Sequence, residues 1–188
     1  MSDLRRDPIS PQERAEPVEV VAYDPAWPAA FETLRARIAP VLGELAVGIE
    51  HVGSTAVPGL DAKPILDVDV VIRYASDFDE VARRLASLGY QHLGDLGIVG
   101  REAFRAPAGA PRHHLFVCAS GSAALQAHLT LRDALRADPA LVTAYGTLKR
   151  ELALQFRDDR DSYTEGKTAF ILSVLLDVRE GRRRSLRH

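Results

Sequence analysis

The chain has few residues with special chemistry: one cysteine, one tryptophan and one methionine among 188 residues, and only 6% aromatic residues. A single cysteine, Cys118, excludes an internal disulfide framework and a zinc site built on thiolates, and its apolar strand predicts an inert thiol. No stretch approaches the ~18 consecutive apolar residues of a membrane span, and no secretion signal opens the chain. We therefore expect a cytoplasmic protein with no membrane partner.

Neither sign of charge is in excess, because 24 Lys and Arg face 26 Asp and Glu, for a formal net charge of −2. Nucleic-acid-binding domains are usually strongly basic, and the sequence also lacks the interleaved aromatic and basic residues of an RNA-binding surface. It contains neither a GxxxxGK[ST] loop nor a GxSxG motif, which excludes a P-loop kinase and a serine hydrolase of the α/β type.

Both ends of the chain differ in composition from the middle. Residues 1–17 hold three prolines and several charges with little to bury, which predicts a flexible N-terminal tail. Residues 179–188 are rich in arginine and predict a solvated basic C-terminal tail. Residues 18–178 contain no repeat and no linker, and we interpret them as a single domain.

Apolar periodicity predicts the secondary structure of the first half. A helix begins with Asp24 as its N-cap and Pro25 at its first position, and Pro40 kinks or ends it. Gly89 ends a later helix. In chain order, we expect a strand over 18–22, the first helix, strands over 47–52 and 65–72, and the second helix over 77–88.

The second half contains hairpins and then helices. Glycines and prolines divide residues 90–118 into short strands, the last of which is His113–Cys118, with a hairpin tip over 106–111. Helices follow over 121–136, from Asp138 and from Asp161. This order predicts an α+β fold with a mostly antiparallel or mixed β-sheet flanked by α-helices and a helical C-terminal part.

A glycine turn follows the strand over 47–52 and carries two hydroxyl groups. Gly53 allows the backbone to approach a ligand closely, while the backbone N–H groups and the hydroxyls of Ser54 and Thr55 offer donors. Such a turn is typical of a phosphate site. We expect His51, immediately before the turn, to orient it through a hydrogen bond.

Asp67 and Asp69 share one face of the next strand, because alternate side chains of a strand point the same way. The apolar residues beside them face the core. Two neighbouring carboxylates repel each other and are costly to desolvate, and a divalent cation that prefers oxygen ligands relieves both costs. The pair indicates Mg²⁺ or Mn²⁺, whereas by itself it would also suit an exposed sheet edge with ordinary aspartates.

A set of motifs extends over residues 18–178: YDPAW (23–27), EHVGSTAVPG (50–59), AKPILD (62–67), GIVGR (97–101), HH (113–114), LRD (131–133), YGTLK (145–149) and YTEGK (163–167). In this order, the motifs resemble the GrpB-like family of the nucleotidyltransferase superfamily, which has the polymerase-β-like fold. The resemblance implies that Gly53 and Ser54 hold the phosphates of ATP or another nucleoside triphosphate. Asp67 and Asp69 would bind the metal.

The implied reaction transfers a nucleotidyl group to a hydroxyl of an unidentified small molecule, protein or RNA. The superfamily pattern includes a third carboxylate on a later strand, but His113–Cys118 has none. The family resemblance implies that His114 faces the site there, as a metal ligand, a general base or a hydrogen-bond partner of a sugar; the alternative is a structural histidine. A nucleotide-binding module without transfer activity and an interaction domain without ligand are therefore alternatives.

Four cations are candidates to meet phosphate. Lys63 precedes the aspartate strand, and Arg101 follows a glycine turn where its guanidinium can clamp an anion. Lys167 shares a helical face with apolar residues that point to the interior, and snorkelling is the alternative there. Lys149 lies on a helix, where a solvated flank is the favoured alternative to a phosphate contact.

Overall fold

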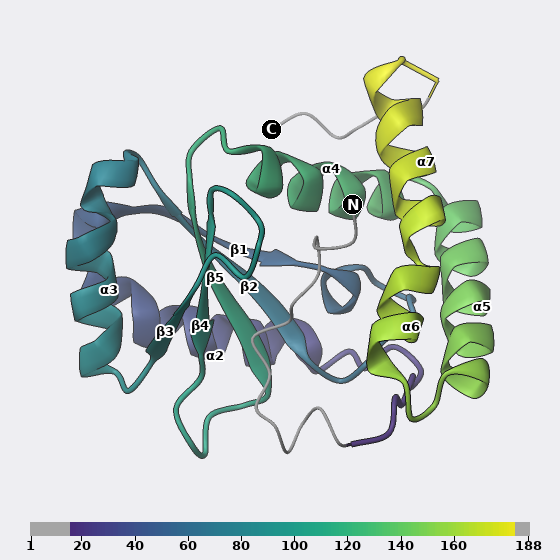
Figure 1. The fold of residues 1–188 in the computed structure, drawn as a ribbon, viewed down its shortest axis with the longest axis horizontal. Helices are drawn as coiled ribbons and strands as arrows, with labels where there is room; N and C mark the ends of the chain where they lie inside the picture. Colours follow the sequence, from purple (N-terminus) through teal and green to yellow (C-terminus); the bar gives the residue numbers. More distant parts are fainter. Residues whose placement is uncertain (1–15, 183–188) are drawn as a thin grey trace.

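The computed structural model describes residues 16–182, so the predicted N-terminal tail up to residue 15 and residues 183–188 of the basic tail lie outside the described residues (Figure 1). Within residues 16–182, a five-stranded sheet has the order β1-β2-β5-β4-β3. The strands are β1 (Ala46–Val52), β2 (Leu66–Ile72), β3 (Gln91–Gly94), β4 (Arg101–Arg105) and β5 (His113–Ala119). Only β2 and β5 are parallel among these neighbours, which confirms a mixed sheet.

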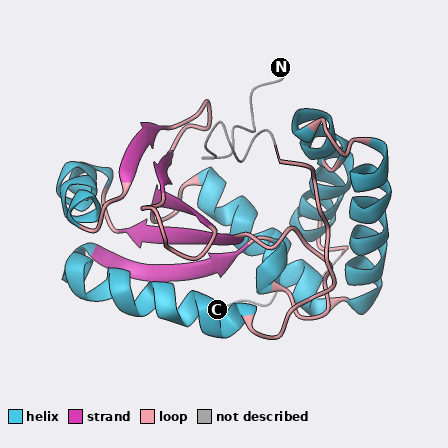
Figure 2. Cartoon of the chain, turned by 90° about the horizontal axis from the view of Figure 1, so that it is seen from below, coloured by secondary structure: helices cyan, strands magenta, loops and turns pink. Residues whose placement is uncertain are grey.

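Helices pack on both faces of the sheet and beside one end of it (Figures 1 and 2). The helices α2 and α3 cover one face and α4 covers the other, while α5, α6 and α7 form the helical C-terminal part. Their bounds are α2 (Trp27–Leu42), α3 (Phe78–Ser87), α4 (Ala123–Ala137), α5 (Pro139–Gln155), α6 (Arg160–Gly166) and α7 (Thr168–Arg179). The prediction of an α+β fold is confirmed.

The alternation of side chains along β2 separates two cores. Val68 and Val70 are fully buried against α2 and α3. Val71 and Phe116 of β5 belong to a second cluster, which Leu125 of α4 completes. Because β2 lies inside the sheet, Asp67 and Asp69 are not residues of an exposed edge.

Two N-terminal predictions need correction. Residues 18–22 form no strand. The N–H of Val18 bonds to the backbone oxygen of Arg157, whereas Val21 makes an isolated bridge with Ala62. Because the two residues have different partners, no ladder forms. The helix α2 begins at Trp27, not at Pro25. Asp24 accepts a hydrogen bond from the Ala26 N–H and so organises the turn before the helix.

Further differences concern helix ends. α2 passes Pro40 and ends two residues later at Leu42, where Gly43 adopts a positive φ of 56°. The helix predicted from Asp161 is two helices, because the helix is interrupted at Lys167, between α6 and α7. None of the helices within residues 16–182 is long and apolar enough to cross a membrane.

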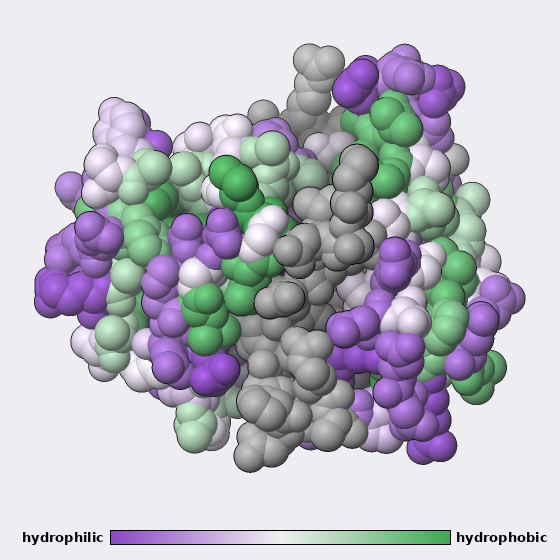
Figure 3. Space-filling view, viewed as in Figure 1, coloured by the Kyte–Doolittle hydropathy of each residue, from purple (hydrophilic) through white to green (hydrophobic). Residues whose placement is uncertain are grey.

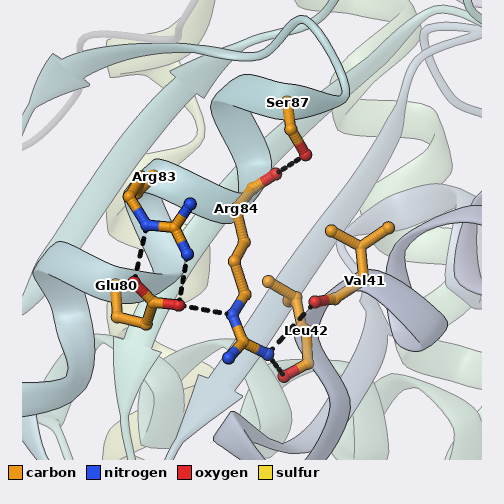
Figure 4. Close-up of polar contacts among 6 residues, drawn as sticks. All are labelled: Val41, Leu42, Glu80, Arg83, Arg84 and Ser87. Atoms are coloured by element: carbon orange, nitrogen blue, oxygen red, sulfur yellow. Dashed lines mark hydrogen bonds and ion pairs between the residues drawn. The ribbon is translucent and has the colours of Figure 1, made fainter.

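An arginine of α3 joins this helix to the end of α2 (Figure 4). Arg84 donates hydrogen bonds to the backbone oxygens of Val41 and Leu42, at 3.3 and 3.0 Å. The last carbonyl groups of a helix have no partner inside the helix, so these bonds cap α2. Glu80 accepts hydrogen bonds from both Arg83 and Arg84 and holds the guanidinium groups in place.

Candidate functional site

The turn after β1 lies directly against β2 at Gly53. Its φ is 70°, and a Cβ at this position would overlap the carboxylate of Asp67. Only glycine meets both conditions, since other residues rarely adopt this φ and all carry a Cβ. Ser54–Ala56 then form the short 3₁₀ turn η2. The structure therefore brings the predicted phosphate turn and the first predicted metal ligand together.

His51 supports this turn from the face covered by α2. Its Nε2 lies 2.9 Å from Thr55 Oγ1, and its ring stacks on Phe31 with 4.8 Å between centroids. Burial lowers the pKa of His51 to about 4, and the charge of Arg136 lowers it further against the opposing effect of Asp67. A neutral imidazole therefore holds Thr55 at physiological pH.

The two aspartates of β2 each pair with a histidine from another element. His114 is opposite Asp67 in the parallel register of β5, and its Nδ1 lies 2.9 Å from Asp67 Oδ1. His128 of α4 places its Nδ1 2.7 Å from Oδ2 of Asp69, which is fully buried. Because an ionised carboxylate only accepts hydrogen bonds, Nδ1 is the donor in both pairs.

The sequence interpretation missed His128. Burial opposes its charged form, but the charge of Asp69 and the hydrogen bond to it outweigh this cost and raise the pKa of His128. The available signal was a histidine on the helical face that includes Leu125 and Leu129, both of which pack on the sheet. Its pairing with Asp69, 59 residues away in sequence, required the packing of α4.

No cluster of three or more His, Cys, Asp or Glu residues in a metal-binding arrangement occurs within residues 16–182. The imidazoles of His114 and His128 occupy one oxygen of each aspartate. Two buried polar atoms, Asp69 Oδ1 and His114 Nε2, nevertheless have no hydrogen-bond partner within that range. The carboxylate oxygens of Asp67 and Asp69 suit both Mg²⁺ and Mn²⁺, so the residues present fit the predicted cation.

The three lysines of the chain surround two buried tyrosines. Lys149 of α5 lies 4.6 Å from the ring centroid of Tyr145. Lys63 and Lys167 lie 5.6 and 4.5 Å from the ring centroid of Tyr163. Cations over aromatic faces are stabilised without losing their ability to meet an anion. All three predicted lysines therefore belong to one cluster, which we call the lysine cluster.

Lys149 is 2% exposed, so the favoured expectation of a solvated flank is wrong. Its neighbours explain the burial: Tyr145 packs with Val57 and Leu60, while Leu152 packs with Tyr163. The Lys149 Nζ has no hydrogen-bond partner among the described residues. Burial lowers the pKa of Lys149 to about 6, the charges of Lys167 and Lys63 lower it as well, and Asp67 opposes the shift.

Tyr145 links the lysine cluster to the glycine turn. Burial raises the pKa of its hydroxyl above the usual range, and the neighbouring side chain of Ser54 opposes this shift. The ring of Phe170 stacks on Tyr145 at 4.7 Å, nearly parallel, and so holds it from α7. This bridge was not predicted, because a tyrosine at helical spacing is indistinguishable from a core residue in the sequence.

Arg101 lies at the Asp69 side of the site. Its guanidinium stacks 4.2 Å from the ring centroid of Phe116, the residue opposite Asp69 on β5, and its charge opposes protonation of His128. Glu50 of β1 also stands opposite Asp69, but Arg132 of α4 binds its carboxylate at 2.7 Å. The positions beside Asp69 thus hold an aromatic ring and a neutralised carboxylate.

A cleft of about 750 Å³ lies next to η2 rather than over the aspartates. Phe31, His51, Arg136 and Val142 are among its lining residues. Cys118 is buried in β5, and burial raises the pKa of its thiol to about 12, as expected for an inert cysteine.

Comparison of the sequence with known proteins identifies the family of the chain. The pattern of the GrpB protein family matches residues 17–176. The chain belongs to the GrpB family. The UPF0157 protein YqkA of Bacillus subtilis (strain 168) is 33% identical over 154 residues, and the UPF0157 protein PA4798 of Pseudomonas aeruginosa is 38% identical over 162 residues. These matches cover 82% and 84% of this GrpB chain, but only 45% and 66% of the two relatives.

Solved structures place the GrpB fold in a wider group. The crystal structure of GrpB from Enterococcus faecalis matches with a TM-score of 0.78 and 33% identity, over 87% of this chain and 99% of that one. Cid1 poly(U) polymerase with Mg 3′-dATP bound matches with a TM-score of 0.52 and 18% identity, over 85% of this chain and 51% of Cid1. The predicted nucleotidyltransferase-like fold is confirmed.

Proposed function

We propose that this GrpB protein binds a nucleoside triphosphate together with Mg²⁺ or Mn²⁺ and transfers a nucleotidyl group to an acceptor hydroxyl. The observation that carries the proposal is Lys149, a 2%-exposed amine over the ring of Tyr145 that has no hydrogen-bond partner within residues 16–182. A buried lysine without an anion is costly, and a polyphosphate supplies the missing charge. ATP is the first candidate.

The phosphate groups would lie between the glycine turn and the lysine cluster. Tyr145 connects the two, since it contacts Ser54 and carries Lys149 over its ring. Binding of the polyphosphate favours the protonated form of Lys149, because an adjacent anion raises the pKa of an amine. Lys63 and Lys167, both over the ring of Tyr163, would add charge that compensates the remaining phosphate oxygens.

Asp67 and Asp69 would hold the divalent cation. When bound, the cation neutralises phosphate charge and aligns the triphosphate with the attacking oxygen. Gly53 keeps the phosphate turn in contact with Asp67. His114 and His128 orient the two carboxylates by donating from Nδ1, as the outer partners of ligands commonly do.

In the proposed reaction, the acceptor oxygen attacks the α-phosphorus while its proton moves to Nε2 of His114. A new P–O bond forms, the bond from the α-phosphorus to the bridging oxygen breaks, and pyrophosphate leaves with that electron pair towards the lysine cluster. The Asp67–His114 pair supports this role, since a carboxylate that accepts from Nδ1 leaves Nε2 available as the acceptor of a proton.

A second candidate function, nucleotide binding without transfer, is favoured by a specific observation. Phe116 stands opposite Asp69 on β5, and Glu50 on the other side is bound by Arg132. Neither position offers a free third carboxylate to activate the acceptor. Under this candidate the triphosphate and the cation are a regulatory or structural ligand.

Calorimetric titration with ATP, in Mn²⁺, in Mg²⁺ and in EDTA, tests the proposal. The matched variants are Asp67→Asn and Asp79→Asn, because Asp79 is an exposed aspartate on α3. We expect metal-dependent binding by the wild type and by Asp79→Asn, and its loss in Asp67→Asn. Release of pyrophosphate with a hydroxyl acceptor identifies the transferase, and binding without release identifies the second candidate. Equal or absent binding in all three proteins would contradict both.

A further inference from the structure

A second hollow of about 420 Å³ opens beside the lysine cluster. It is bordered by four cationic side chains and two carboxylates, from Glu16, Glu19, Lys63, Arg112, Arg157 and Arg160. The surface over α6, which contains Arg160, is hydrophilic (Figure 3). Lys63 belongs both to this basic hollow and to the lysine cluster, so the hollow continues the proposed triphosphate site.

The most buried charge of the basic hollow is Arg160, whose side chain is 7% exposed. Its Nη2 lies 3.5 Å from the backbone oxygen of Glu16, at the long end of the range for a hydrogen bond. A guanidinium stays charged at any physiological pH, and its fork of donors matches the geometry of a phosphate group. Arg160 therefore gives the hollow a permanent positive charge below the surface.

The carboxylate of Glu16 forms an ion pair with a cation of this hollow. Its Oε2 lies 2.7 Å from Nη2 of Arg112, and both side chains are about half exposed, at 49% and 45%. Such exposed ion pairs are weak, because solvent screens them and two long side chains must be immobilised. A phosphate with two negative charges competes well against a single exposed carboxylate.

The hollow lies close to the reacting groups. The Leu66 N–H bonds to the backbone oxygen of Arg112 at 3.1 Å, which joins the beginnings of β2 and β5. His114 follows Arg112 by two residues, and Asp67 follows Lys63 by four. At about 3.3 Å per residue, these separations amount to at most ~7 and ~13 Å between the Cα atoms. A small molecule spans that range between a phosphate in the hollow and a hydroxyl near Nε2 of His114.

We propose that the basic hollow binds the phosphate group of the acceptor, and that the acceptor is a small hydroxyl-bearing phosphate monoester. This inference rests on the proposed function, since it names the substrate class of the same site. The volume is that of a small-molecule site, and Glu16 and Glu19 at its border would repel the successive phosphates of a longer polyanion. Both features favour a small phosphate ester over RNA.

Titration followed by ³¹P NMR tests this assignment, with inorganic phosphate and ribose 5-phosphate as probes, in the full chain with and without saturating ATP. Arg112→Gln removes a cation of the hollow, and Glu16→Gln removes the competing carboxylate. We expect both probes to bind the wild type about tenfold more tightly than Arg112→Gln, and Glu16→Gln to bind them about threefold more tightly than the wild type. Arg83→Gln on α3, an exposed arginine outside the hollow, should match the wild type.

ATP affinity, measured separately in each protein, distinguishes the two proposals. If ATP binds while neither probe responds to the changes at Arg112 and Glu16, the acceptor hollow is wrong and the proposed function stands. If both probes bind with the expected pattern while ATP does not, the hollow is a phosphate site and the proposed function is wrong. Tighter binding of a hexauridylate than of ribose 5-phosphate, lost in Arg112→Gln, would overturn the small-molecule class in favour of RNA.

Discussion

Two features constrain Gly53: its positive φ and the close approach of the Asp67 carboxylate. A side chain there has to accept a φ of 70° and displace the carboxylate of Asp67. Gly109 has a similar φ of 78° but lies in open space, with no atom within 4 Å of the position that a Cβ would take. Comparing the two glycines therefore separates the cost of backbone strain from the cost of the close approach.

We expect Gly53→Ala to lower the free energy of unfolding by about 2–4 kcal/mol, since strain and overlap both contribute. Gly109→Ala should cost only about 1 kcal/mol. Urea denaturation of both variants measures the difference, and ATP titration should show lost affinity in Gly53→Ala alone. Equal losses of stability would mean that Asp67 moves aside without cost.

The burial of Lys149 makes the stability of the protein depend on pH. In the unfolded chain its pKa is the ordinary 10.5, whereas in the folded protein it is lowered to about 6. Between these pH values the unfolded chain binds one more proton, so this residue makes stability rise with pH from about 6 towards 10.5. The cost is greatest at and below pH 6, where the buried site opposes protonation in full.

We expect Lys149→Met to raise the melting temperature at pH 7, by about 2–4 °C for each kcal/mol recovered, and to abolish ATP binding. The gain should shrink as the pH approaches 10. Scanning calorimetry at pH 6.5 and pH 9 measures both effects, with Arg35→Met on the exposed face of α2 as control. A less stable Lys149→Met protein at pH 6.5 would show that Lys149 already has an anionic partner.

At the scale of elements, α3 stabilises the end of α2 through one arginine. Arg84 caps two carbonyl groups of α2, whereas Arg83 pairs with Glu80 of its own helix and is largely exposed (Figure 4). We expect Arg84→Gln to lower the free energy of unfolding by about 1–2 kcal/mol and Arg83→Gln to leave it almost unchanged. Urea denaturation tests this, and ATP affinity should be unchanged in both. Similar losses in both variants would assign the stability to Glu80 instead.

The break between α6 and α7 is also an element-scale feature with a consequence for the site. A Cβ at Gly166 would meet Leu152 of α5, so α6 approaches α5 more closely than a larger residue permits. This approach places Tyr163 against Lys63, and the break leaves Lys167 at the start of α7 over the same ring. The two short helices therefore bring cationic side chains of the lysine cluster together, which one straight helix would not do.

At the scale of the molecule, the proposed site lies between the sheet and the helical C-terminal part. Asp67 and the glycine turn belong to the sheet, whereas Lys149, Tyr145 and Lys167 belong to the helical C-terminal part. A ligand held by both parts stabilises the folded state as a whole. At a concentration 100 times its Kd, a ligand adds about 2.7 kcal/mol.

We therefore expect Mn²⁺ and ATP together to raise the melting temperature by about 5–10 °C. The increase should be smaller in EDTA and absent in Lys149→Met. Thermal denaturation over a range of ATP concentrations measures this linkage. An unchanged melting temperature at millimolar ATP would contradict ligand binding across the two parts.

The sequence by itself determined the local features of the protein. Alternation along 65–72 predicted which side chains of β2 face the core, and the helix over 77–88 was located to within a residue at each end. The glycine turn and the aspartate pair were likewise visible, because each depends on residues close together in the chain. Periodicity and turn chemistry report such short-range relations directly.

Only the tertiary structure decided how these features combine. The pairing of Asp69 with His128, the burial of Lys149 and the bridge from Tyr145 to Ser54 all join residues distant in the chain. The strand predicted over 18–22 also depended on contacts distant in the chain. A strand needs one continuous partner, but Val18 bonds to Arg157 whereas Val21 bonds to Ala62. A sequence pattern shows which face of a helix is apolar, but only the packing of the helices decides what that face contacts. In α5 this packing buries Lys149.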